Sequence, residues 1–462
     1  MKLNGKLLFT YFFFLFLILI SNYGGLHAMS RPPLLFKDTL KVTTFDVDAT
    51  PPEGSWMAYD SLLNTWDLGL RAKGIVLLGS GKPIVLCVVD WIGIANEGHD
   101  AFRDALAKAA GTTIDRVAVH TLHQHDAPTC DFGAEQFLKK EGLKVYGFES
   151  SFHKEVIRRL GVAVKNSIAK AQVVTHVGLG KAVVDSVASN RRIVGDDGKI
   201  MFSRTSATRD PKIRNTPEGL IDPEVSIISL WNKNKPLVLM SYYATHPQSY
   251  YRTGVSNPDI PGVARFFRQL AVPDALNLHF NGASGNITVG KYNDGAHVNR
   301  YILAQRLEDG LKRAWAATVK SPVTAADVQW KVVPVALPAK SNLDSIKYLL
   351  HTQPTTFLAN NTSKYVWNQR VRAGKKIDFT SLVIGKARTV HLPGEPFIEF
   401  QLAAKKIRPD LFVTVAGYGD YAPGYICTEE AYKEGGYEPG MASAVTADAE
   451  KVMLDAIRRL LK

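Results

Sequence analysis

The chain has 462 residues, of which 46% are hydrophobic and 21% are charged, with 36 Gly, 23 Pro and 3 Cys. This composition excludes a disordered chain, a collagen-like fibre and a small disulfide-stapled domain, and the length allows a large hydrophobic core. The formal net charge is +13, so a nucleic-acid partner has to be tested against where the basic residues lie.

Residues 1–28 are typical of a secretory signal peptide. Two lysines precede an apolar run over 7–20, and the small residue Ala28 offers a cleavage point. The run is short for a membrane span, so an uncleaved anchor is the weaker alternative. We therefore predict an exported protein, periplasmic or secreted, whose mature chain, 29–462, keeps a net charge of 13 − 2 = +11.

Predicted strands and helices alternate along the mature chain, which contains no sequence repeats. We expect strands at 84–90, 116–119, 225–230, 236–243, 382–390 and 411–416, and helices at 97–110, 151–171, 298–317 and 446–461. Gly111 is expected to end the first helix and Thr446 to cap the last one. The pattern predicts an α/β (α+β) fold, a single large domain with mixed β-sheets flanked by helices, with a possible helical insertion at 341–376.

The basic residues are spread along the chain as short pairs, such as Arg191-Arg192, Lys375-Lys376 and Lys405-Lys406. None of the pairs forms a stripe with interleaved aromatic residues, so no nucleic-acid partner is expected. Peripheral contact with an anionic or membrane surface stays open, and the sequence indicates no protein partner.

A group of histidines follows the predicted strand 116–119. Residues two apart on an extended chain point to one face, so His123 and His125 are expected to converge, with His120 on the opposite face. Such a pair is a common way to place imidazoles around a metal. Its alternative is a polar loop without one.

His246 and Glu395 also follow predicted strands. Alone, each has a simpler interpretation, a histidine bonded to backbone and a glutamate in a surface turn. Catalytic groups concentrate on loops held by a rigid sheet, and two histidines with a carboxylate form a known catalytic zinc set. Together the three residues predict a shared metal site.

Two further loops have less specific signals. The segment from Tyr421 to Glu430, with its continuation to Tyr437, is rich in aromatic residues. These residues alone are typical of a loop that packs on the core. The segment from Asn281 to Thr288 brings backbone amides and hydroxyls together, which suits either a carbonyl-polarising loop or an ordinary turn.

These five segments resemble the catalytic domain of the neutral/alkaline non-lysosomal ceramidases, the neutral ceramidase family of zinc amidases that cleave the N-acyl bond of ceramide. The family's H-T-H-S-G-P motif matches 123–128, and its P-G-E motif matches 393–395. The resemblance covers roughly Lys41 to Gly440. It implies Zn²⁺ held by His123, His246, Glu395 and Tyr425, substrate or oxyanion contacts from His125, Arg191 and Tyr437, and a hydroxyl from Thr288 that orients or assists attack.

The chain also departs from the family pattern. Thr288 stands where the family has serine, and its β-methyl limits its rotamers. Asp126 replaces another serine, which places a carboxylate beside the expected metal as a proton acceptor or a binder of a substrate hydroxyl. The family's C-terminal β-sandwich domain is expected to be missing.

Three functions therefore compete. The first is a zinc hydrolase acting on an N-acyl bond of a lipid or small molecule. The second is the same metal site acting on an ester, lactone or glycan-derived substrate. The third is a non-catalytic binding protein.

Cysteine use adds one more alternative. Cys87 is expected to be a buried thiol, whereas Cys130 and Cys427 lie a few residues from His125 and Tyr425. In an exported protein, a disulfide between these two cysteines would brace the site. Two free thiols are the alternative.

Overall fold

The computed structural model describes residues 39–145 and 150–462, and these residues belong to one compact unit. The predicted signal peptide, 1–28, lies outside the described residues. Among the residues that are described, we find no helix long and apolar enough to cross a membrane.

The chain forms three main sheets, and the same arrangement of strands occurs in each of them. In each, three strands run antiparallel to their sequence neighbours, and a helix then leads to a fourth strand parallel to the third. The elements are β1 (Lys41–Asp48), β2 (Arg71–Gly79), β3 (Gly81–Val89), α1 (Asn96–Ala110) and β5 (Val117–Thr121); then β8 (His176–Val183), β12 (Glu224–Asn232), β13 (Lys235–Tyr243), α5 (Asp259–Ala271) and β14 (Leu276–Asn281); then β17 (Val328–Val335), β18 (Ile377–Ile384), β19 (Ala387–His391), α9 (Ile398–Ile407) and β21 (Phe412–Ala416).

A second helix completes each unit by packing on its first strand. These helices are α3 (Ser150–Ser167) on β1, α6 (Val298–Ala316) on β8 and α11 (Ala449–Leu461) on β17. The fold is therefore a threefold structural repeat of β-β-β-α-β-α, which we call repeats 1, 2 and 3. The sequence shows no repeat because the three units share hydrogen-bond pattern and apolar positions rather than residue identities.

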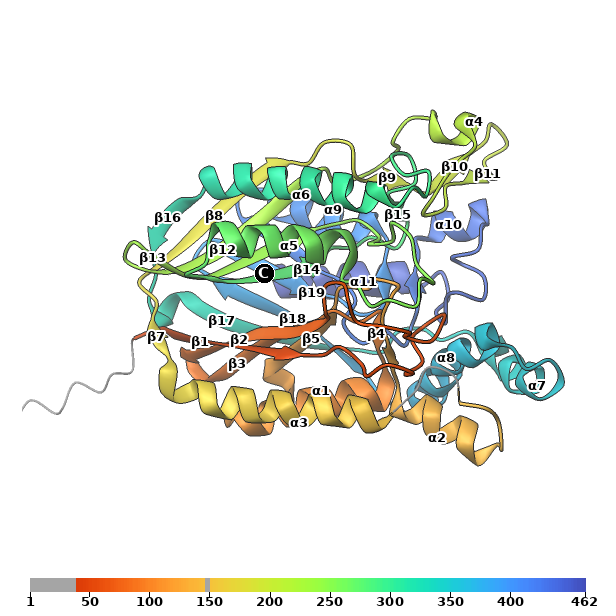
Figure 1. Cartoon of the computed structure of the whole chain (residues 1–462), viewed down its shortest axis with the longest axis horizontal. Helices are drawn as coiled ribbons and strands as arrows, with labels where there is room; N and C mark the ends of the chain where they lie inside the picture. The colour runs from red at the N-terminus through yellow and green to blue at the C-terminus, as the bar shows by residue number, and fades with distance from the viewer. Residues whose placement is uncertain (1–38, 146–149) are drawn as a thin grey trace, which may run out of the picture. The chain divides into compact units, whose positions relative to one another are not determined.

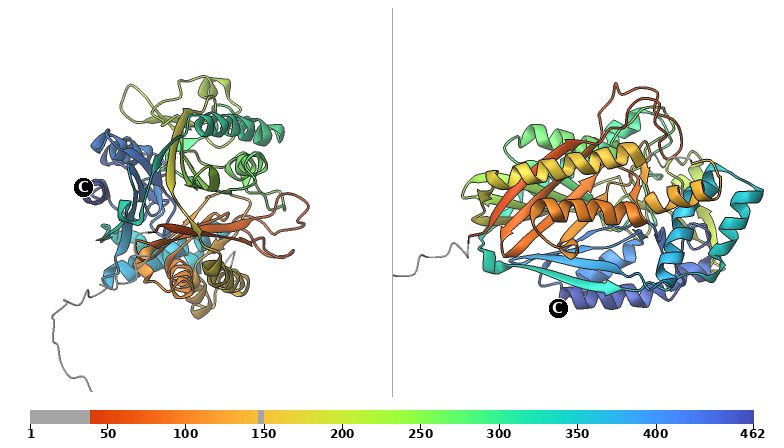
Figure 2. Two further views of the ribbon diagram at one scale, coloured as in Figure 1. Left: turned by 90° about the vertical axis from the view of Figure 1, so that its left-hand side faces the viewer. Right: turned by 90° about the horizontal axis from the view of Figure 1, so that it is seen from below.

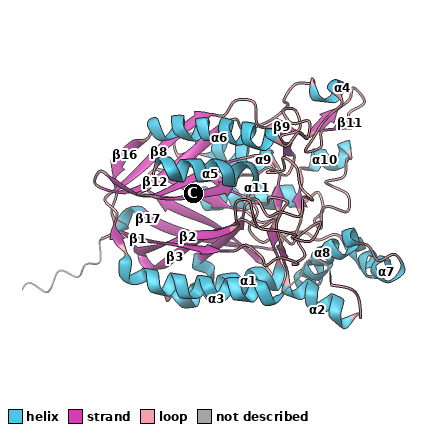
Figure 3. Cartoon of the chain, in the orientation of Figure 1, coloured by secondary structure: helices cyan, strands magenta, loops and turns pink. Residues whose placement is uncertain are grey.

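The three sheets surround a common core, and their paired helices lie outside (Figures 2 and 3). One cluster of buried side chains includes Ile75 from repeat 1, Leu278 from repeat 2 and Leu382 from repeat 3. Apolar strand faces leave water by packing against one another, which is the main driving force for this arrangement. The prediction of mixed sheets flanked by helices is confirmed.

Two details of the prediction were wrong. The expected strand 382–390 is the hairpin of β18 and β19, because Gly385 takes a left-handed φ of 56° and turns the chain. The last helix begins later than expected, with Asp448 rather than Thr446 at its N-cap. Gly111, with φ of 68°, ends α1 as predicted.

The region 341–376 carries two helices, α7 (Asp344–Thr352) and α8 (Thr356–Arg372), inserted between β17 and β18. Helix α8 packs against α2 (Phe132–Lys140), which lies in the connection after β5, at the right-hand end in Figure 1.

The carboxyl ends of the three fourth strands lie close to one another. The amide of Thr121 donates to the carbonyl of Tyr418, and the amide of Gly417 donates to the carbonyl of Asn281. Backbone hydrogen bonds thus join loops that leave different sheets. Open sheets commonly bind ligands at the carboxyl ends of their strands.

Candidate metal centre

Three donor atoms from three repeats converge on one point. His123 follows β5, His246 follows β13 and Glu395 follows β19. The two Nε2 atoms are 3.0 Å apart, and Oε2 of Glu395 lies 3.2 Å from that of His123 and 3.5 Å from that of His246. All three side chains are buried.

The outer nitrogens of the two imidazoles fix which atoms face inward. Nδ1 of His123 donates to the carbonyl of Ile92 at 2.8 Å, and Nδ1 of His246 donates to the carbonyl of Ser284 at 3.0 Å. A carbonyl only accepts hydrogen bonds, so each Nδ1 carries a proton, and in the neutral ring each Nε2 then offers a lone pair.

Lone pairs and a carboxylate oxygen therefore face one another in a buried space. Burial, and then the charges of Arg191 and His123, lower the pKa of His246 well below its ordinary value, which leaves its ring neutral. Oε2 of Glu395 has no hydrogen-bond donor. One proton on His123 would serve only one of the two acceptors, whereas a divalent cation satisfies all three atoms. The donor set fits zinc chemistry.

Glu395 is held as a charged carboxylate. Burial alone would raise the pKa of its carboxyl, but Lys364 and the protonated form of His123 lower it, and the Tyr421 hydroxyl donates to Oε1 at 3.0 Å. Together these neighbours keep the pKa of Glu395 below its usual value.

His125 joins the same group with a different orientation. One nitrogen from each of His123, His125 and His246 lies within 4.8 Å of the others. Nδ1 of His125 accepts a hydrogen bond from the Gln248 amide at 2.9 Å, so in the neutral ring Nε2 carries the proton. That Nε2 is buried without a partner, which suits a donor to a substrate oxygen better than a third metal ligand.

Tyr425, Arg191 and Tyr437 form a chain from the metal group to the surface. The Tyr425 hydroxyl accepts from Nη1 of Arg191 at 3.1 Å and lies 3.2 Å from the Tyr437 hydroxyl. The Tyr425 ring stacks parallel to His246 at 6.3 Å. Burial raises the pKa of Tyr425 well above its usual value, although Arg191 opposes this. Tyr437 is 47% exposed and marks the mouth of the site.

The Thr288 hydroxyl bonds to backbone rather than to the histidines. It donates to the carbonyl of Thr205 at 3.1 Å and accepts from the amide of Gly290. The residue lies in the short strand β15 (Ile287–Thr288), which pairs with β9 (Ser189–Asn190) just before Arg191.

The Asp126 carboxylate, which was expected beside the metal, has its partners outside the group of His123, His246 and Glu395. The carboxylate pairs with Arg300 of α6 at 3.1 Å and accepts from the backbone amide of Arg252 at 2.9 Å. Burial raises the pKa of Asp126 to about 7 even though Arg300 opposes the shift. A buried carboxylate needs such a countercharge, and the guanidinium supplies it.

The possible disulfide between Cys130 and Cys427 is absent from the structure, where both cysteines and Cys87 are free and buried. Cys130 packs in the hydrophobic cluster of repeat 1, while Cys427 packs in the cluster of repeat 3. The two thiols are thus parts of different cores.

Sequence reasoning missed several residues around the metal group. The Tyr418 ring stacks on His123 at 4.4 Å, and its hydroxyl lies 2.7 Å from that of Ser284. The Tyr59 ring stacks on His125 at 5.4 Å. Tyr418 lies two residues after the predicted strand 411–416, so the strand-end argument that found His246 would have found it too.

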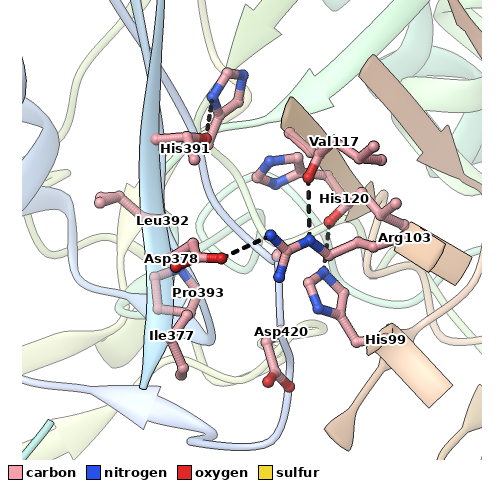
Figure 4. A pocket seen from close by; sticks show the side chains of 14 residues that line it. His99, Arg103, Val117, His120, Ile377, Asp378, His391, Leu392, Pro393 and Asp420 are labelled. Carbon is pink, nitrogen blue, oxygen red and sulfur yellow. Dashed lines mark hydrogen bonds and ion pairs between the residues drawn. The ribbon is translucent and has the colours of Figure 1, made fainter. Parts of the chain in front are cut away.

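A second group of histidines lines a cavity of about 20 Å³ behind β5 (Figure 4). Here each ring has its own partner: His120 bonds to the carbonyl of Gly417, His99 to that of Val119, and His391 to the Thr380 hydroxyl. The volume is about that of one water molecule.

The chain is similar to two solved ceramidase structures. The neutral ceramidase from Pseudomonas aeruginosa superposes with a TM-score of 0.64 at 16% identity, covering 92% of this chain and 74% of that one. A structure of a ceramidase complexed with C2 gives 0.66 at 15% identity, covering 92% and 75%. No family model matches the sequence, and no curated protein matches it. The chain therefore has a neutral-ceramidase-like fold, which confirms the resemblance expected from its motifs.

Proposed function

We propose that this chain, with its neutral-ceramidase-like fold, is a zinc-dependent hydrolase that cleaves an N-acyl (amide) bond. The observation that supports this most is the meeting of two imidazole lone pairs and a charged carboxylate oxygen within 3.5 Å. The solved structures similar to it are described as ceramidases, which supports the choice of an amide bond.

In this proposal His123, His246 and Glu395 hold the ion, with Tyr425 as the fourth ligand. Bound zinc would polarise the substrate carbonyl and lower the pKa of a water molecule. A tyrosine ligand has to lose its proton, and Arg191, 3.1 Å from the Tyr425 hydroxyl, favours the phenolate.

The remaining side chains would hold the substrate. The unpartnered Nε2–H of His125 is placed to donate to the carbonyl oxygen as negative charge develops there. Arg191 also has an unpartnered buried Nε, and Tyr437 at the mouth offers its hydroxyl. Thr288 can assist only if its hydroxyl leaves the carbonyl of Thr205.

The test is turnover of N-acyl-sphingosines against acylated sugars and aryl esters, each assayed with zinc and after chelation. We expect zinc-dependent release of fatty acid from the amides. His246→Ala should lose both zinc and turnover, while His351→Ala, on the exposed face of α7, should keep both. Turnover of esters with no amide cleavage would replace the amide with the second substrate class.

We also propose that the protein is exported and works against a lipid surface. The signal-peptide pattern of 1–28 supports export. Leu63 and Trp66 are 70% and 76% exposed on the loop that carries Tyr59 to His125, and tryptophan favours membrane interfaces. Trp66→Glu should weaken binding to phosphatidylcholine vesicles without changing turnover of a water-soluble amide.

A further inference from the structure

We propose that the buried network of Asp126, Arg300 and Asp259 is a positioning device that holds His125 in its working orientation. Asp126 and Arg300 would thus be positioning residues rather than groups that touch the substrate. The kinetic part of the test rests on the proposed function, whereas the inference itself rests on contacts around His125.

Arg300 is the centre of the network. Its Nη2 lies 3.1 Å from Asp126 Oδ2 and 3.5 Å from Asp259 Oδ2, and all three side chains are at most 3% exposed. Nε donates to the Ser249 hydroxyl at 2.9 Å, and Nη2 donates to the carbonyl of Tyr250 at the same distance. The guanidinium also lies 3.7 Å from the centre of the Tyr250 ring.

The carboxylates of Asp259 and Asp126 accept hydrogen bonds from opposite ends of the segment 249–253. Asp259 accepts hydrogen bonds from both the amide and the hydroxyl of Ser249, at 3.1 and 3.0 Å. Asp126 accepts from the amide of Arg252 at 2.9 Å and from the Thr253 hydroxyl at 3.4 Å. Arg300 thus fixes the path of this segment between two anchors.

This segment and the residue before it contact the His125 ring. Gln248, next to Ser249, donates to Nδ1 at 2.9 Å, and the Tyr251 ring meets the imidazole edge to face at 5.4 Å. Asp126 is also the residue that follows His125, and its amide donates to the side chain of Gln124. The network therefore acts on His125 both through the backbone and through the facing segment.

Asp126→Asn is the sharpest test because Asp259 remains to balance the charge of Arg300. We expect kcat to fall about 10- to 100-fold, the loss typical of a misplaced catalytic group, with KM and bound zinc unchanged. Arg300→Lys keeps the charge but loses the planar fork, and it should show the same split between kcat and KM.

Asp185→Asn is the matched control, since Asp185 pairs with Arg313 of the same helix α6 but both side chains are exposed. We expect it to leave kcat, KM and zinc unchanged. An unchanged kcat in both Asp126→Asn and Arg300→Lys would overturn the proposal, and so would a parallel loss of zinc.

A second measurement does not depend on turnover. In histidine-labelled protein, the ¹⁵N resonances of the His125 ring should shift in Asp126→Asn and Arg300→Lys but not in Asp185→Asn. If the wild-type protein cleaves no amide, the proposed function fails, and this measurement still decides the role of the network. Unmoved His125 resonances in both network variants would overturn it.

Discussion

His123 in repeat 1 and Tyr418 in repeat 3 occupy the same place in the fold and have different partners. Each stands two residues after the end of its fourth strand, with a left-handed φ of 62° and 59°. The rings stack on each other at 4.4 Å. His123 turns a nitrogen toward His246 and Glu395, whereas the Tyr418 hydroxyl turns to Ser284. The repeated backbone thus creates equivalent positions, and the side chain decides which of them joins the candidate metal group.

We expect the largest loss of zinc binding and activity when the imidazole of His123 in repeat 1 is removed. His123→Ala leaves only His246, Glu395 and Tyr425 of the four proposed ligands, so we expect bound zinc to be lost and kcat/KM to fall by roughly 10³-fold or more. Metal analysis and amidase kinetics on the purified variant check this. Full zinc occupancy in His123→Ala would mean that His125 replaces it as a ligand.

Zinc should also stabilise the folded chain, and only through this group of ligands. At a free zinc concentration of about 100 times the dissociation constant, the free energy of unfolding should rise by about 2.7 kcal/mol. Thermal unfolding with zinc and with chelator measures the shift in wild type and in His123→Ala. Equal shifts in both proteins would show that zinc acts at another site.

Another histidine of repeat 1 shows how burial changes the pKa of a side chain that lies away from the strand ends. His153 in α3 packs 4.9 Å from the Trp91 ring, and burial lowers its pKa to about 3. Because the unfolded pKa is near 6.5, its neutral ring supports the fold above that pH and this support is lost as pH falls. At pH 5 the loss is about 2 kcal/mol.

His153→Phe should remove that part of the acid sensitivity. Urea unfolding of both proteins at pH 8 and pH 5 provides the measurement, with the difference between the two pH values as the quantity compared. If the variant lost as much stability on acidification as the wild type, His153 would already be charged in the fold.

We expect the smallest change, a modest loss of stability, when Tyr418 of repeat 3 is substituted. Tyr418→Phe keeps the ring that stacks on His123 and removes the hydroxyl contact with Ser284, which should cost about 1 kcal/mol of stability. Zinc content should stay at the wild-type level. Loss of zinc in this variant would contradict the division of roles between the two repeats.

The sequence allowed the residues of the metal group to be predicted because each follows an apolar strand. His123, His246 and Glu395 needed only that local pattern, and the family motifs added Tyr425 and Arg191. The convergence of His123 and His125 was predicted from an extended chain, but the left-handed φ of His123 shows that a turn brings the rings together.

The sequence could not indicate partners that lie far away along the chain. The neighbour of Asp126 is Arg300, far along the chain, and no local pattern links them. Cys130 and Cys427 are each close to a site residue in sequence, yet they pack in different cores. The threefold repeat was not predicted for the same reason, because it is defined by pairing between strands such as β3 and β5.

The origin of the candidate metal group in three repeats has a consequence for how the protein matures. The segments that carry His123, His246 and Glu395 lie far apart in sequence, so the three side chains meet only when parts of all three repeats have packed together. Contacts so distant in sequence form late in folding, and metal ligation is then coupled to the last steps. In a purified sample, the fraction of chains that retain zinc would then measure how many have folded completely. Truncated or misfolded chains would not retain the ion.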